Sequence, residues 1–386
     1  MRLASKLANL PPYLMAEANR RIAAKQAQGI DVINLGMGNP DLPTPEWVVE
    51  ALCRAVQDPR NHGYPNYYGI PELRAAFARY YARRFGVELD PAREVVPLIG
   101  SKEGLVHLTN VLCNPGDIVL VPDPAYPVYR IAAILAGADV YPVPLLEENG
   151  YLPDLEAIPD WIAKRARLLW LNYPNNPTAA VADAAFFSRT VEFARRYDLV
   201  VAHDNAYADV SFDGYRPPSF LEVPGAKDVG VEFYSLSKTF NMAGWRVGAV
   251  VGNAEVVQAV ARVKTNVDSG IFTPVQLAAV AALETAPEWI VQRNRIYERR
   301  RDLVLDALKA AGIQAPRPQA GLYIWGRVSG NLSSMDFCLR LLDETGVWVT
   351  PGSGFGERGE GYFRLALTEP DERLEEAVRR LASFRA

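Results

Sequence analysis

Lys238 is the residue of this chain whose type and surroundings most directly suggest chemistry. It lies in SLSKTFNMAGWRVG (235–248), between hydroxyl residues and directly after an apolar run. A lysine that is partly buried or surrounded by positive charge has a lowered pKa, so its neutral amine can attack a carbonyl group and form a Schiff base. Asp204 ends a second apolar run, and a carboxylate in such a place can keep a pyridinium nitrogen protonated.

A possible phosphate cradle accompanies these two residues. GSKEG (100–104) is a Gly-Ser turn between a predicted strand and a predicted helix, where backbone N–H groups and the positive end of a helix dipole face an anion. Ser101 can add its hydroxyl, and Lys102 its charge or only its backbone N–H. Ser235 and Arg246 can close over the same phosphate, and the arginine can do so with two parallel hydrogen bonds. A nucleophilic lysine, a carboxylate for a ring nitrogen and this cradle together predict a pyridoxal phosphate site.

Each of these residues also has a purely structural explanation. Lys238 can be a solvated loop residue, and Asp204 and Asn176 can cap turns, which aspartate and asparagine do well. Arg246 can form a surface ion pair of little energetic value. Three tyrosines can be ordinary core or rim residues: Tyr64, Tyr126 and Tyr207. The joint arrangement at consecutive strand ends favours the functional interpretation.

Short apolar runs alternate with helical patterns over most of the chain. The predicted buried strands are VVPLI (95–99), DIVLVP (117–122), RLLWLN (167–172), LVVAHD (199–204), VEFYSL (231–236) and VGAVVG (247–252). Helical spacing of apolar residues is found at 71–86, 101–112, 183–197 and 253–266. This alternation predicts an α/β fold with a mostly parallel sheet flanked by helices. Since ligands bind outside the carboxyl ends of such strands, five of the following loops should converge on one site.

The pattern changes after about residue 288. A long charged helix is followed by short apolar runs and two further helices, which predicts a smaller α+β domain. We therefore expect a large domain over 46–288 and a small domain built from 1–45 and 289–386. In YFRLAL (362–367) the alternation places Arg364 on the face opposite to Phe363 and Leu365, where it meets either solvent or a ligand.

Composition excludes several classes of protein. The chain has 386 residues, of which 49% are hydrophobic, so it can bury a large core. Its net charge is -4 with both signs interspersed, which argues against nucleic-acid binding. Three widely spaced cysteines suggest neither disulfides nor a metal site, and no apolar run suits a signal peptide or a membrane span. We expect a cytoplasmic protein with no metal ion and no membrane or nucleic-acid partner.

Several motifs resemble those of the class I and II aminotransferases, which are fold-type I pyridoxal phosphate enzymes. SLSKTFNMAGWRVG is similar to the lysine signature of that family, NYPNNPT to its Asn-Pro-Thr turn and AHDNAY to its Asp-x-x-Tyr element. Six further segments fall in the family's order: INLGMGNPD, GYPNYYGIPELR, GSKEG, PDPAYPVY, VWVTPGSGFG and GYFRLAL. The resemblance therefore covers essentially the whole chain.

The resemblance implies roles around the cofactor ring. Lys238 would hold the cofactor as a Schiff base and then act as general acid and base. Asp204 would pair with the ring nitrogen. Tyr207 and Asn176 would hydrogen-bond the ring hydroxyl oxygen, and Tyr126 would stack on the ring face.

The resemblance also implies how the phosphate and the substrate are held. The phosphate would be bound by Ser101, Lys102, Ser235 and Arg246. Tyr64 would reach this site from the partner subunit of a homodimer. Arg364 would bind the α-carboxylate of the substrate, while the backbone near Gly38 closes on it. The substrates would be an amino acid and a 2-oxo acid in a ping-pong reaction.

The choice of amino acid is less constrained. LPPYLMAEANRR and VKTNVDSGIFTPVQ resemble the LL-diaminopimelate aminotransferase branch, whose acceptor would be 2-oxoglutarate. Such a two-ended substrate requires a second polar subsite, for which Tyr13, Asp268 and Ser269 are candidates. Alanine, aspartate or aromatic transamination remains open, as does β-elimination on the same scaffold. A DNA-binding regulator is disfavoured because the family pattern leaves no room for a helix-turn-helix module.

One position departs from the family pattern. Ala179 follows Asn-Pro-Thr where the family usually has glycine, which tolerates a positive φ that alanine resists. Either the turn differs slightly or the residue does not need that conformation. We expect a small change of geometry and retained activity.

Overall fold

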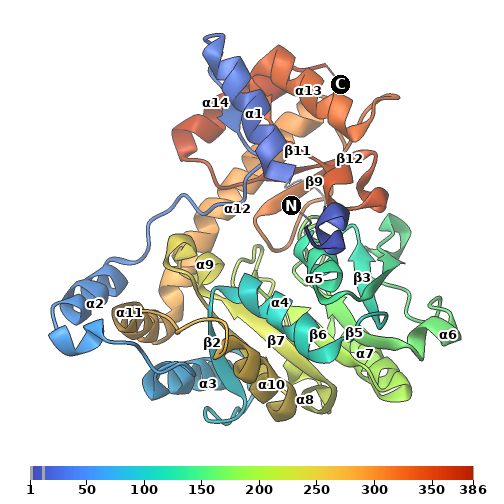
Figure 1. The fold of residues 1–386 in the computed structure, drawn as a ribbon. Coiled ribbons are helices and arrows are strands. Elements are labelled where there is room, and N and C mark those ends of the chain that lie inside the picture. The colour runs from blue at the N-terminus through green and yellow to red at the C-terminus, as the bar shows by residue number, and fades with distance from the viewer. Residues whose placement is uncertain (1–2, 11–13, 386) are drawn as a thin grey trace.

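A seven-stranded sheet forms the centre of the computed structural model, which describes residues 3–10 and 14–385 (Figure 1). The strand order is β2-β8-β7-β6-β5-β3-β4. The strands are β2 (Val95–Ile99), β3 (Ile118–Asp123), β4 (Asp139–Pro144), β5 (Ala166–Leu171), β6 (Val200–Asp204), β7 (Gly230–Ser235) and β8 (Val247–Gly252). Strand β8 runs antiparallel to both of its neighbours and the other strand pairs are parallel, so the prediction of a mostly parallel sheet is confirmed.

The edge strand β4 is not among the predicted strands. Two prolines interrupt its sequence, DVYPVP, and only Val143 of its residues is buried. Proline is tolerated at the edge of a sheet, where one side of the strand needs no hydrogen-bond donor. The sequence pattern of a buried strand is therefore missing, although the strand is present.

Helices cover both faces of this sheet. Alternate residues of each strand point to opposite faces, as with Leu168 and Leu169 of β5, which belong to two different apolar clusters. The helices α3 (Pro71–Phe85), α7 (Ala184–Tyr197) and α11 (Thr273–Leu283) contribute to one cluster. The helices α4 (Ser101–Leu112), α5 (Val128–Ala136) and α10 (Ala254–Lys264) contribute to the other. The remaining helices of this part are α2 (Glu46–Val56), α6 (Asp160–Ala163), α8 (Ala226–Val229) and α9 (Leu236–Thr239).

A third apolar cluster joins the two ends of the chain. It combines residues between Ile22 and Leu35 with residues from Tyr297 onward and with three residues of the 207–212 segment, and Figure 1 shows α1 (Leu14–Ala27) beside the C-terminal helices. Strand β1 (Ile33–Asn34) pairs with β10 (Val347–Trp348) in parallel. The other elements are α12 (Pro287–Ala310), α13 (Ser334–Thr345) and α14 (Asp371–Ser383), with β9 (Tyr323–Arg327), β11 (Thr350–Pro351) and β12 (Tyr362–Ala366) in one antiparallel sheet. In the described residues, no helix combines the length and the apolar character that a membrane crossing requires.

The sheet topology brings five chain segments to one edge. Strands β3, β5, β6 and β7 run parallel. Strand β2 runs in the same direction as β7, because both are antiparallel to β8. The loops that follow these five strands therefore leave the sheet on the same side, as the sequence predicts.

Candidate active site

Lys238 lies in α9, which begins directly after β7. The Ser235 hydroxyl accepts a hydrogen bond from the Ser237 N–H at 3.3 Å and starts this short helix. The Lys238 Nζ is partly buried and donates to the Gly38 carbonyl oxygen at 2.7 Å. Burial, and secondarily the positive charges of Arg364 and Arg246, lower the pKa of Lys238 to about 8. Roughly a tenth of this amine is therefore neutral and nucleophilic at pH 7, far more than for an ordinary lysine.

Asp204 ends β6 and is buried. Its Oδ2 accepts a hydrogen bond from the Tyr129 hydroxyl at 2.8 Å, and its carbonyl oxygen accepts one from Asn172 at 2.6 Å. Its Oδ1 has no hydrogen-bond partner among the described residues, although it is buried. Burial raises the pKa of Asp204 to about 6. An unpartnered buried carboxylate oxygen is what the N–H of a bound pyridinium ring requires.

Tyr129 contacts Asp204 in this site, although the sequence does not single it out. It is fully buried, and its ring stacks on Trp170 with 4.9 Å between centroids and an interplanar angle of 16°. The predicted ring-stacking residue Tyr126 contacts the same tyrosine edge-on at 5.9 Å. Both tyrosines follow β3 in PDPAYPVY, so their spacing within that motif is the sequence feature from which Tyr129 could have been identified.

Arg364 projects from β12 into the protein. Only 6% of the residue is exposed, so a solvated position is excluded. Its Nη1 donates to Asn176 Oδ1 and its Nη2 to the Gly36 carbonyl oxygen, both at 2.7 Å. Its guanidinium carbon lies 4.1 Å from the centre of the Tyr323 ring and 4.7 Å from that of Phe355. The buried Nε has no partner within the described part of the chain, so the guanidinium keeps donors for a carboxylate.

Tyr207 and Tyr323 connect the ring site with the N-terminal segment. Their hydroxyl oxygens lie 3.0 Å apart, and burial, followed by the proximity of Tyr323, raises the pKa of Tyr207 well above its ordinary value. A side chain at Gly38 would collide with the Tyr323 hydroxyl, so only glycine fits there. The 36–38 segment thus contacts both Arg364 and Lys238 through its carbonyl groups.

The residues of the predicted phosphate cradle lie close together at the start of α4. Gly100 has a φ of 72° and a side chain there would collide with the Arg246 guanidinium, so this arginine lies directly over the loop. In the sheet, Gly248 is the partner of both Leu98 and Ser235. A Cβ added to Gly248 would lie 2.9 Å from the Ser101 amide nitrogen, so the start of α4 lies close to this pair of strands. The cradle therefore gathers Ser101, Ser235 and Arg246 around a helix N-terminus, and Lys102 is exposed beside it.

Another predicted residue lies at the surface. Tyr64 is 85% exposed, in a loop at the surface that a second chain can reach. Tyr13 falls outside the described residues.

Asp268 belongs to a different polar cluster. It accepts hydrogen bonds from Lys264 at 2.7 Å and from the Gly270 N–H at 2.7 Å. Glu103, His107 and Asp268 lie close enough together to hold a metal ion, although the sequence predicts no such cluster. The buried Lys264 ammonium lies 3.2 Å from Glu103 and already provides positive charge to this group.

Ala179 takes the conformation that a glycine would favour. Its φ is 59°, and its N–H donates to the Asn175 carbonyl oxygen at 2.9 Å. Of the two alternatives stated for this position, the one in which the residue does not need a positive φ is therefore wrong. The conformation costs roughly 1–2 kcal/mol for an L-residue.

The residues present fit pyridoxal phosphate. A buried amine of lowered pKa, an unpartnered carboxylate oxygen at a strand end and a glycine turn beneath an arginine match the aldehyde, ring nitrogen and phosphate of that cofactor. Arg364 adds donors for a carboxylate beside them.

Comparisons with known proteins agree with this geometry. The family model described as aminotransferase class I and II matches residues 30–381. The chain is 54% identical to the LL-diaminopimelate aminotransferase of Desulforudis audaxviator, covering 98% of this chain and 96% of that protein. It is 52% identical to the enzyme of the same name from Dehalococcoides mccartyi, covering 100% of both. A substrate-bound structure of BacF from Bacillus subtilis is similar with a TM-score of 0.95 and 42% identity, covering 99% of this chain and 97% of that one.

Proposed function

Because the chain belongs to the family of class I and II aminotransferases, we propose that it transfers an amino group from LL-diaminopimelate to 2-oxoglutarate with pyridoxal phosphate as cofactor. The observation that carries the reaction class is the position of Lys238. Its amine has a lowered pKa and lies within electrostatic range of Arg364, which has free donors for a carboxylate. An amino acid held there by its carboxylate brings its Cα toward the lysine.

Several residues of the chain have separate roles in this reaction. When bound, pyridoxal phosphate supplies a ring that withdraws electrons from the Cα of the attached amino acid. We infer that the Lys238 amine would accept the proton from that carbon and release it again, as general base and then general acid. Asp204 Oδ1 would keep the ring nitrogen protonated, and Tyr207 with Asn176 would hold the ring hydroxyl oxygen. The 36–38 segment lies against this group of residues, because its carbonyl oxygens accept hydrogen bonds from Arg364 and Lys238.

The name of the substrate rests on the relatives. The two relatives named as LL-diaminopimelate aminotransferases align over nearly their whole length at 52% and 54% identity. The aspartate aminotransferase of Thermus thermophilus and the aromatic aminotransferase of Pyrococcus horikoshii align at 32% and 31%. This difference supports the diaminopimelate assignment over aspartate or aromatic amino acids.

An absorption experiment tests the proposal. The protein is loaded with pyridoxal phosphate and given LL-diaminopimelate, alanine, aspartate, phenylalanine or methionine, one at a time and without an acceptor. We expect LL-diaminopimelate to convert the lysine-bound cofactor to its pyridoxamine form, and 2-oxoglutarate to restore it. Faster conversion by another donor would contradict the substrate, and pyruvate and ammonia released from sulfur amino acids without an acceptor would indicate β-elimination instead.

We also propose that the protein is a homodimer with shared sites. Exposed aromatic residues gather beside the loop that carries Tyr64: Tyr67, Tyr68 and Phe272, the last in contact with His62. An exposed apolar patch of this kind is typical of an interface. The division into a 46–288 domain and a terminal domain, and the cytoplasmic location, stay predictions.

Mixed dimers distinguish a shared site from an isolated one. Lys238→Ala and Tyr64→Ala are each expected to be nearly inactive alone. In a mixed dimer one of the two sites has both Lys238 and the partner's Tyr64, so mixing should restore about a quarter of the wild-type activity. No recovery after confirmed subunit exchange would contradict a shared site.

A further inference from the structure

Arg293 of α12 is a buried cation without a carboxylate partner. Only 3% of it is exposed, and in the described residues its side chain forms no ion pair. Its hydrogen bonds go to three backbone carbonyl groups and to the Asn294 side chain. Burial lowers the pKa of this guanidinium. Since burying an unpaired arginine costs free energy, its hydrogen bonds must offset that cost, and their partners show which segments it holds in place.

The carbonyl groups that Arg293 binds belong to two functional segments. Its Nη1 donates to the carbonyl oxygen of Lys238 and, at 2.9 Å, to that of Thr239. These are the last carbonyl groups of α9, which have no partner within such a short helix. Its Nη2 donates at 2.6 Å to the carbonyl oxygen of Asp209, which stands two residues after Tyr207. One guanidinium therefore joins the backbone of Lys238 to the turn that carries Tyr207.

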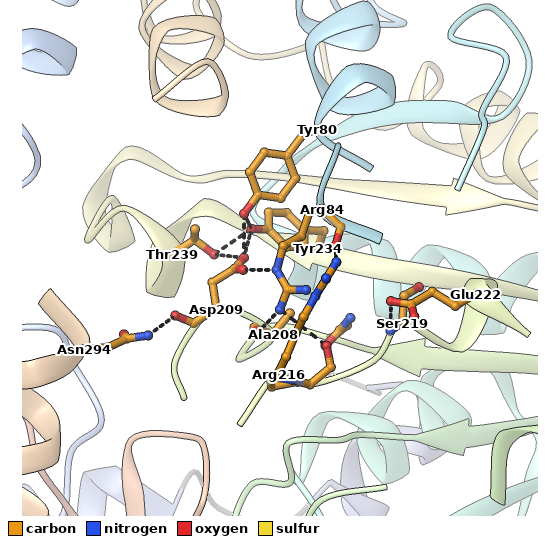
Figure 2. A network of polar contacts seen from close by, with 12 residues as sticks. Tyr80, Arg84, Ala208, Asp209, Arg216, Ser219, Glu222, Tyr234, Thr239 and Asn294 are labelled. Carbon is orange, nitrogen blue, oxygen red and sulfur yellow. Dashed lines mark hydrogen bonds and ion pairs between the residues drawn. The ribbon is translucent and has the colours of Figure 1, made fainter. Parts of the chain in front are cut away.

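The same two segments are joined a second time through the Asp209 carboxylate (Figure 2). Tyr80 donates to it at 2.8 Å, Arg84 at 2.8 Å, and Tyr234 donates as well. The Tyr234 hydroxyl also lies 2.9 Å from the Thr239 hydroxyl. The Asp209 side chain is thus held on one side while Arg293 holds its backbone on the other.

We propose that Arg293 is a positioning residue that fixes the Lys238 backbone relative to Tyr207. This rests on the proposed function, in which both side chains act on one cofactor. The two residues come from loops after different strands, so no local structure sets their separation. A displacement of about 1 Å between reacting groups can reduce a rate by about a hundredfold, which gives such a clamp a role beyond stability.

The test compares Arg293→Met with Arg301→Met. Arg301 is a buried arginine of the same helix, and it binds Asp213 and the Pro318 carbonyl oxygen instead of the site loops. Three quantities are measured: the melting temperature of the cofactor-free protein, the pH dependence of pyridoxal phosphate condensation with the protein, and kcat. Arg293→Lys is included because it keeps the charge and can bind only part of the set of carbonyl groups.

We expect both methionine variants to lose thermal stability. Only the Arg293 variants should change the chemistry, with kcat about tenfold to a hundredfold lower for Arg293→Met and a smaller loss for Arg293→Lys. The midpoint of condensation should move upward from about 8, because a displaced Lys238 loses burial and the nearby positive charges.

Two results would overturn the inference. If both Arg293 variants keep the wild-type midpoint and kcat while melting at lower temperature, the residue is only structural. If Arg293→Met does not fold, Arg293→Lys decides by the same criteria. A wild-type protein that forms no lysine-bound cofactor overturns the proposed function itself, and that result is visible before any variant is compared.

Discussion

Replacing Arg364 by lysine should separate carboxylate binding from every other function of the site. The guanidinium has five N–H donors, of which two are used by Asn176 and Gly36, so three remain for a ligand. Lysine keeps the charge but loses the planar fork that binds a carboxylate with two parallel hydrogen bonds. Losing one such charge-assisted bond costs roughly 2–3 kcal/mol, which lowers kcat/KM by about 30- to 150-fold.

The assay compares two donors in the half-reaction without acceptor. The first is LL-diaminopimelate, and the second is pentane-1,5-diamine, which is the same molecule without its carboxylates. We expect Arg364→Lys to lose the full factor with the amino acid and to react with the diamine at nearly the wild-type rate. Equal losses with both donors would show that Arg364 acts on the cofactor or the fold, and would refute carboxylate binding by this residue.

Three further predictions concern single groups. Tyr129→Phe removes a hydrogen-bond donor to Asp204 and so raises the pKa of that carboxyl above about 6. Because less of the carboxylate is then available to the ring nitrogen, the Kd of pyridoxal phosphate at pH 7.5 should rise about tenfold in an absorbance titration. Because the neutral amine is the nucleophile, condensation of the cofactor with Lys238 should accelerate as pH rises through about 8 and then level off; a midpoint near 10.5 would contradict its lowered pKa. Ala179→Gly relieves a positive φ and should stabilise the fold by about 1 kcal/mol in a thermal unfolding assay, whereas a loss of stability would show that the turn is unstrained.

The sequence predicts the sheet well because its buried strands are apolar and end in polar loops. It fails at β4, where Pro142 and Pro144 stand in an exposed edge strand. The periodicity of apolar residues reflects which side chains are buried, and an edge strand buries few side chains.

The site is predicted less completely than the sheet. Lys238 and Asp204 follow recognisable strands, so their convergence can be inferred from topology. Tyr129, Tyr323 and Arg293 cannot be found in the same way, because each acts through a partner that is distant in sequence. Arg293 stands in a helix rich in charged residues, where the pattern predicts a solvated side chain and the structure buries it.

The central claim is that Lys238 is the residue that binds the cofactor covalently. It is tested by loading the protein with pyridoxal phosphate, reducing the linkage with borohydride, and locating the added mass by peptide mapping. The account predicts one label per chain, on the peptide that contains Lys238, and its absence after incubation with LL-diaminopimelate before reduction. A label on Lys102 or on another lysine, or no label at all, would contradict the account.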